Sequence, residues 1–250
     1  WDELNGWDKA AVRGVIAVYE GGKFKYYNSS GAGQGTELVL SNGVIAKHQA
    51  FWVQAITDGD LIIGEQAKVV PSTITPPVSP ANQMLLTLND GSTTDQALIV
   101  VSPGATNNYD PGLDAPKFDN AGMDISTVAA DGTPLAFNFL EPFGCGESID
   151  VHIQDVTSGN YTLSVNTIAS FDVPYLVTLR DNFLNVDHNV NNQPNYAFTI
   201  DDADVNTFEN RFTILYDADL NDLVNEDLSY ILNLNVSIVQ TLFHCCRNIL

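Results

Sequence analysis

Residues 149–165 read I-D-V-H-I-Q-D-V-T-S-G-N-Y-T-L-S-V, and this stretch decides the class of the fold. Apolar and polar side chains alternate on both sides of a polar break at Ser158-Gly159. Successive side chains of a β-strand point to opposite faces, so a period of two buries one face and leaves the other in solvent. The stretch therefore predicts two half-buried strands.

The same alternation recurs at residues 175–180 and 196–200. Gly, Pro, Asn and Asp separate the segments at intervals of about ten residues, which is typical of sandwiches and jelly rolls. We therefore predict an all-β chain built from antiparallel β-sandwich or jelly-roll-like units. Further strands are expected at Val12–Tyr19, Phe24–Tyr27, Glu37–Leu40, Ala50–Ala55 and Leu61–Ile63. Turns are expected at Gly21-Gly22, Asp90-Gly91, Asp131-Gly132 and the Gly-rich residues 31–35.

A proline-rich segment divides the chain. Residues 71–80 contain four prolines, which cannot donate to a β-ladder and favour an extended path. We therefore expect an N-terminal β unit over residues 1–70, truncated at its start, then a linker over 71–81. A β-sandwich domain over 82–214 follows, and an acidic segment with a C-terminal tail occupies 215–250. Apolar residues near helical spacing predict one short helix within residues 216–232.

The charge balance limits the partners. The chain has 250 residues, 31 acidic and 10 basic, and a formal net charge of −21. Such a surface repels phosphate backbones and anionic membranes, so nucleic acid is a poor partner. No apolar run reaches the roughly 18 residues of a spanning helix, so we expect no membrane insertion. The composition fits a secreted protein that can collect divalent cations.

Two acidic loops are candidate calcium sites, because Ca²⁺ prefers oxygen ligands. The first loop carries Asp110 and Asp114. In the structural alternative for this loop, the Asp side chains accept backbone N–H bonds and Lys117 pairs with an acid. The second loop carries Asp201, Asp202 and Asp204, for which the alternative is a solvated acidic loop.

A third candidate calcium segment reads D-A-D-L-N-D-L-V-N-E-D-L from residue 217. It is similar to the calcium loop of dockerin modules, with Asp217, Asp219 and Asn221 at the first, third and fifth positions. The similarity then ends, because Asp222 replaces the turn glycine and Leu228 the final carboxylate.

Catalytic groups are not apparent. Glu141 and Glu147 could imitate a glycosidase pair, but the nearby Pro142 and glycines favour a loop. We find no nucleophile–base pair or metal triad in the sequence and expect no enzymatic activity. An exposed Trp52 could stack on sugars, although core packing is the usual fate of such a residue.

Ordered motifs run through most of the chain. They are Trp1-Asp2, Gly6-Trp7, Val15–Tyr19, Tyr26-Tyr27, Ile45–Ala55, then Leu86, Leu88 and Gly91, then Gly104, Ala105, Thr106, Tyr109, Asp110, Asp114, Ala115 and Lys117, then Gly159, Tyr161, Leu163, Val177, Leu179, Asp181, Tyr196, Phe198, Arg211 and Phe212. Together, over residues 1–214, they resemble the region before the C-terminal sorting domain of Bacteroidota surface proteins exported by the type IX secretion system. Here only Val236–Phe243 could begin such a sorting domain.

The resemblance implies an extracellular, cell-surface location and contact with the secretion machinery. It favours a non-catalytic structural or adhesive module of a surface or filament protein, an adhesin-like role. The alternative is a carbohydrate-binding accessory module of a secreted glycan-active enzyme, with glycans as partners. Residues 233–250 carry an alternating apolar stripe, so we also expect β-edge pairing with other copies or other surface proteins. The alternative is a tail that folds back on its own domain or frays.

Overall fold

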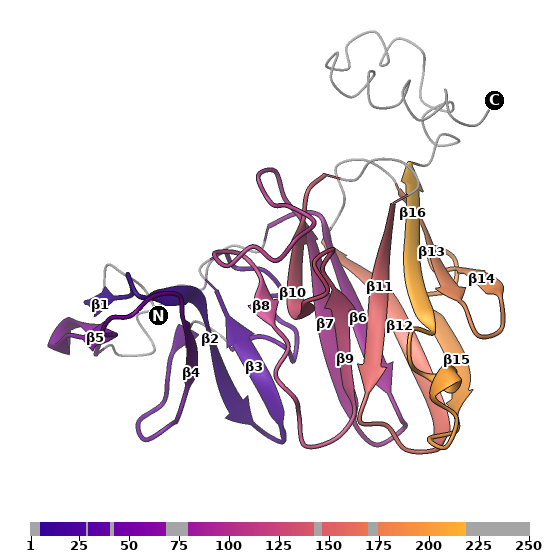
Figure 1. The fold of residues 1–250 in the computed structure, drawn as a ribbon, viewed down its shortest axis with the longest axis horizontal. Helices are drawn as coiled ribbons and strands as arrows, with labels where there is room; N and C mark the ends of the chain where they lie inside the picture. Colours follow the sequence, from indigo (N-terminus) through magenta and orange to yellow (C-terminus); the bar gives the residue numbers. More distant parts are fainter. Residues whose placement is uncertain are drawn as a thin grey trace, which may run out of the picture.

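The computed structural model describes residues 6–28, 30–40, 43–68, 80–142, 147–169 and 175–218. Within these ranges the regular structure is β-strand, apart from a 3-10 turn at Gly43 and the single-turn 3-10 helices η3 (Glu65–Ala67) and η5 (Val205–Thr207). The all-β prediction is therefore confirmed (Figure 1). The strands are β1 (Trp7–Asp8), β2 (Val12–Glu20), β3 (Lys23–Tyr27), β4 (Trp52–Ala55), β5 (Ile62–Ile63), β6 (Gln83–Asn89), β7 (Thr94–Val101), β8 (Ala115–Pro116), β9 (Asp124–Val128), β10 (Pro134–Leu140), β11 (Glu147–Gln154), β12 (Gly159–Ala169), β13 (Tyr175–Asp181), β14 (Val186–Asn189), β15 (Asn195–Ile200) and β16 (Phe212–Ala218).

One large sheet dominates the molecule. Its strands follow the order β14-β13-β16-β11-β9-β10-β7-β6-β12-β15, and β8 pairs with β10 beside this path. The sheet curls into a nearly closed barrel, in which Tyr196 of β15 reaches Asp181 of β13. The predicted antiparallel sandwich differs from this arrangement in two ways. The strands belong to one continuous sheet, and β7 and β10 run parallel because the chain crosses over through β8 and β9 between them.

The inner face of the curled sheet forms the larger core. Residues 149–165 behave as their alternation predicts: Ile149, Val151, Ile153, Tyr161, Leu163 and Val165 are buried. They pack with inward side chains of β6, β7, β13, β15 and β16. Because the alternate side chains face outward, most of the outer surface of this sheet is polar.

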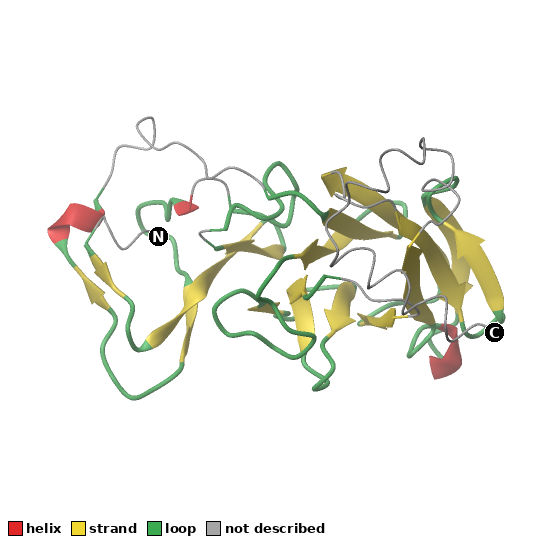
Figure 2. Cartoon of the chain, turned by 90° about the horizontal axis from the view of Figure 1, so that it is seen from above, coloured by secondary structure: helices red, strands yellow, loops and turns green. Residues whose placement is uncertain are grey.

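The outer face of β6, β7 and β10 is covered by the N-terminal strands. These strands form a small antiparallel sheet of order β3-β2-β4. Leu98, Phe137 and Phe139 of the large sheet pack with Ala17 and Tyr26 of the small one. In Figure 2 the N-terminal strands extend the molecule to one side of the large sheet. Strand β7 is therefore buried on both faces, which explains its continuous apolar run.

Local predictions have mixed outcomes. The turns are confirmed: Gly21, Gly22, Gly91 and Gly132 have φ of 64°, 86°, 92° and 88°, and residues 32–35 form turns. The predicted strand Glu37–Leu40 is wrong, because this segment makes only an isolated bridge between Tyr26 and Val39. Residues 216–218 of the predicted helix belong to β16, where pairing with β13 keeps them extended. The rest of that helix lies outside the described residues.

The proposed domain boundaries at 1–70, 71–81, 82–214 and 215–250 stay predictions, and most of the proline-rich linker lies outside the described residues. Within the described ranges no helix is long and apolar enough to cross a membrane.

Candidate functional site

The carboxylates of the first acidic loop accept hydrogen bonds from backbone N–H groups. The Asp110 side chain accepts hydrogen bonds from Thr106, at 2.5 Å from its N–H and 3.0 Å from its hydroxyl. Asp114 accepts N–H bonds from Asp110 and from Phe139 of β10, each at 2.6 Å. Asp114 is fully buried, so it fastens the loop to the large sheet. This geometry favours the structural alternative for the loop.

Burial changes the acidity of Asp114. Loss of hydration raises the pKa of its carboxyl to about 7, although the N–H groups of Asp110 and Phe139 oppose the shift. Tyr109 in the same loop carries the Arg13 guanidinium over its ring, 4.6 Å from the ring centroid. Burial likewise raises the pKa of Tyr109.

The second acidic loop is also held by its own hydrogen bonds. Asp204 is the N-cap of η5, and its side chain accepts the Asn206 N–H at 3.1 Å. Asp201 accepts the Ala203 N–H, and Asp202 accepts the Ser158 hydroxyl. These contacts are those of capping and turn residues.

The third acidic segment lies almost wholly outside the described residues. Asp217 belongs to β16, and Asp219 and Asn221 follow the described range. Within the described ranges no three His, Cys, Asp or Glu side chains are grouped to hold a metal ion. Calcium binding at the three acidic segments stays a prediction.

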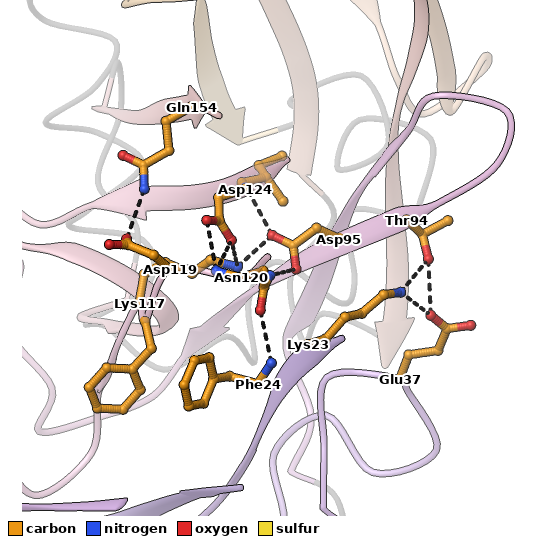
Figure 3. A network of polar contacts seen from close by, with 12 residues as sticks. Lys23, Phe24, Glu37, Thr94, Asp95, Lys117, Asp119, Asn120, Asp124 and Gln154 are labelled. Carbon is orange, nitrogen blue, oxygen red and sulfur yellow. Dashed lines mark hydrogen bonds and ion pairs between the residues drawn. The ribbon is translucent and has the colours of Figure 1, made fainter. Parts of the chain in front are cut away.

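A buried ion network joins the small sheet to the large one (Figure 3). Lys117 forms ion pairs with Asp95 of β7 and with Asp124 of β9, the latter at 3.1 Å. Asn120 donates to Asp95 at 2.9 Å and accepts the N–H of Phe24 of β3 at 2.8 Å. Burial raises the pKa of Asp124, and Lys117 opposes the shift. The network therefore ties β3 to β7 and β9.

A second buried ion pair closes the curled sheet. Arg211, 2% exposed, donates from Nη2 to Asp181 at 2.7 Å and from Nη1 to the carbonyls of Thr199 and Thr207. Tyr196 donates its hydroxyl to the same carboxylate at 2.9 Å. Burial works against ionisation of Asp181, but the bonds from Arg211 and its neighbours keep its pKa below the ordinary value. The pair links β13, β15 and the start of β16.

The outward face of β6, β12 and β15 forms a shallow groove of about 630 Å³. Its lining is mostly uncharged and polar, comprising Thr87, Asn89, Asp90, Gly91, Asn160, Tyr161, Thr162, Ser164, Asn195, Ala197, Phe198 and Thr199. The Asp90 carboxylate accepts hydrogen bonds from the N–H groups of Ser92 and Thr93 in a turn. Trp52, 40% exposed, lies on β4 against Phe24 and does not line this groove. The groove offers hydroxyl and amide groups, and Asp90 is the one charged residue in its lining.

Comparison with known families gives one match. DUF8693, described as a domain of unknown function, matches residues 72–216. The chain belongs to this family. The DUF8693 region runs from before β6 to within β16 and does not include β1–β5. No curated protein and no solved structure matches the chain.

Sequence reasoning found some of these residues and missed others. The ordered motifs include Asp114, Lys117, Asp181 and Arg211. The side chains of all four are buried and connect separate segments of the chain. The partners of Lys117 were missed, because Asp95 and Asp124 are isolated acids in a strongly acidic chain. Only strand pairing between distant segments brings them together.

Proposed function

We propose that the chain is a non-catalytic structural or adhesive module of an exported bacterial cell-surface or filament protein. The observation that carries this proposal is that the motif residues make structural contacts. Leu86, Leu163 and Leu179 fill the core, and Asp114 and Arg211 hold loops and strands together. Motif residues that make structural contacts suit a module that presents a stable surface.

The proposal extends to location and partners. We place the module outside the cell, delivered by a secretion machinery and paired through β-edges with other copies or other surface proteins. An alternating apolar stripe in residues 233–250 supports the pairing, since an apolar strand is stabilised when it pairs with the edge of another β-sheet. Removal of these residues should lower the number of chains per particle, as measured by light scattering. Monomers for both the full and the shortened chain at high concentration would contradict pairing through the tail.

Surface location is tested on intact cells of the source organism. Antibodies against the purified chain should label intact and permeabilised cells equally, and external protease should remove the signal. Labelling that requires permeabilisation would contradict the proposal. A cytoplasmic marker protein, protected from the protease in the same cells, is the control.

The second candidate function is a carbohydrate-binding accessory module. The groove over β6, β12 and β15 favours it, because its lining is rich in hydroxyl and amide groups and sugar hydroxyls both donate to and accept from such groups. A glycan array separates the two candidates. Binding lost in Thr162→Lys, which places a long charged chain in the groove, would support this function. Thr57→Lys, in the exposed segment after β4, makes the same substitution outside the groove and is the matched control.

Calcium is a proposed cofactor of the acidic segment that begins at Asp217. A ligand that binds only the folded chain stabilises it by RT ln(1 + [L]/Kd), about 2.7 kcal/mol at a hundredfold excess over Kd. Millimolar Ca²⁺ should therefore raise the melting temperature above that in chelator. An unchanged melting temperature would remove calcium from the proposal.

A further inference from the structure

Lys117 lies buried between two carboxylates. Its Nζ forms ion pairs with Asp95 of β7 and with Asp124 Oδ1 of β9, the latter at 3.1 Å (Figure 3). The side chains of Lys117, Asp95 and Asp124 are 3%, 4% and 1% exposed. The other ion-paired lysines of the described ranges are at least 27% exposed. Lys117 is thus set apart as a lysine that contacts two acids away from solvent.

Aromatic residues of β3 pack beside this network. The Phe24 N–H donates to Asn120 Oδ1 at 2.8 Å, and the Tyr26 hydroxyl accepts the Phe118 N–H at 2.8 Å. The rings of Tyr26 and Phe118 are stacked, with their centroids 6.1 Å apart. Burial raises the pKa of Tyr26, and the nearby charges of Asp95 and Asp124 add to the shift. The network therefore lies in an environment that excludes water.

The charges of the network favour a neutral lysine. Two carboxylates face one ammonium group, and burial raises the pKa of Asp124, so Asp124 is the carboxyl that keeps a proton. Transfer of a proton from Lys117 Nζ to Asp95 Oδ2 replaces two buried opposite charges by a neutral amine and a neutral acid. A desolvated lysine amine is a nucleophile.

The carboxyl group of Asp95 is held by two further donors. Asn120 Nδ2 donates to Oδ1 at 2.9 Å, and the Ile125 N–H donates to Oδ2 at 2.7 Å. The Asn120 amide can stabilise negative charge that develops on Oδ1 when a nucleophile attacks Cγ. Amine and acid held in contact in a dry site favour condensation over hydrolysis.

We propose that Lys117 and Asp95 condense to an isopeptide bond in the folded chain, with Asp124 as the catalytic proton carrier. Nζ passes one proton to Asp95 Oδ2, and its lone pair then attacks Cγ to form the C–N bond. Asp124 gives its proton to Oδ2 and regains one from Nζ, the Cγ–Oδ2 bond breaks, and Oδ2 leaves as water. Nζ loses two protons, Oδ2 gains two, and Asp124 returns to its starting state.

The reaction occurs once in each chain and involves no external substrate. It joins β7 covalently to the segment after β8, so the crossover between the parallel strands β7 and β10 begins with a closed ring. The inference goes beyond the proposed surface function and does not depend on it.

The test is the intact mass of the full chain, measured after denaturation. The wild type should be lighter than its sequence by one water molecule. Trypsin should fail to cut after Lys117 and should release residues 69–180 as one fragment. Chymotrypsin, which cuts after Tyr109, should leave the fragments that carry Asp95 and Lys117 joined. A wild-type chain of full mass would overturn the proposal.

Two variants test the assigned roles. Lys117→Arg keeps the positive charge and should have its full mass. Asp124→Asn keeps both reacting groups and should slow bond formation by about 10²–10⁴-fold in a time course after cell-free synthesis. Equal rates for Asp124→Asn and the wild type would overturn the role of Asp124. Lys23→Arg, in the exposed pair with Glu37, is the matched control and should stay lighter by one water.

Another reaction gives the same change in mass. An Asp-Gly step such as Asp90-Gly91 also loses one water when it forms a succinimide. That loss would persist in Lys117→Arg and would leave the tryptic cut after Lys117 intact, and this outcome would overturn the proposal. The joined chymotryptic fragments of the wild type decide the question even if a variant does not fold.

Discussion

At the residue scale, buried carboxylates in this molecule accept hydrogen bonds from the backbone. Asp114 is the clearest case, because both of its oxygens accept main-chain N–H groups while its side chain is fully buried. The carboxylate is the acceptor that joins the loop to β10. Burial nevertheless disfavours the ionised form, so the stability of the chain depends on the protonation of Asp114.

The stability of the chain should fall as pH rises through the range where Asp114 ionises. The folded chain keeps this proton to about pH 7, and the unfolded chain releases it near the ordinary value of 3.8. The folded state thus binds more protons between these values, so the free energy of unfolding decreases with pH there. The raised pKa of Asp124 acts in the same direction. Melting temperatures measured from pH 5 to pH 8 should therefore fall for the wild type.

Asp114→Asn should flatten this pH dependence. It should also lower stability at every pH by about 1–3 kcal/mol, because the amide NH₂ cannot accept the second N–H. Asp150→Asn, on the exposed face of β11, should keep the wild-type slope. Equal slopes for Asp114→Asn and the wild type would contradict the assignment. Asp90, with a pKa of about 2, contributes only in stronger acid.

At the element scale, the curl of the large sheet depends on one ion pair. The side chains of Arg211 and Asp181 are 2% and 1% exposed and lie at the neighbouring strands β16 and β13. Their bonds to Thr199 and Tyr196 reach β15, at the other end of the sheet order. Arg180 and Asp187 form the matching exposed pair on β13 and β14, at 43% and 52%. The two pairs have the same chemistry and differ in burial.

Arg211→Ala should lower the free energy of unfolding by about 3–5 kcal/mol, because it leaves Asp181 charged and unpaired in the interior. Arg180→Ala should cost less than about 1 kcal/mol, since water replaces the exposed arginine. Urea denaturation of both variants measures the difference. Similar losses for the two would show that the buried pair does not close the sheet.

The sequence predicted the elements better than their assembly. Alternation located β11, β12, β13 and β15, because each has one buried and one wet face. The run A-L-I-V-V at residues 97–101 could have shown that β7 is buried on both sides. The parallel pairing of β7 with β10 had no local signal. The meeting of Asp95 with Asp124 had none either, because β7 and β9 come together only in the folded chain.

At the scale of the whole molecule, the N-terminal sheet protects the DUF8693 region. The match begins at residue 72, yet the outer face of β6, β7 and β10 within it is apolar. Val15, Ala17 and Tyr26 of the N-terminal strands cover that face. Asn120 and Lys23 add polar ties between the two parts. The small sheet therefore completes a core of the larger one.

A chain that starts at residue 72 should consequently be less stable than the full chain and should self-associate. Its Leu98, Val100, Phe137 and Phe139 would meet solvent, and large exposed apolar patches drive association. Dye binding to exposed apolar surface and light scattering should both increase relative to the full chain. Adding Phe137→Ser to the shortened chain should reduce the association by making the uncovered face more polar. A shortened chain that is monomeric, binds no dye and melts with the full chain would show that residues 1–70 do not contribute to the core.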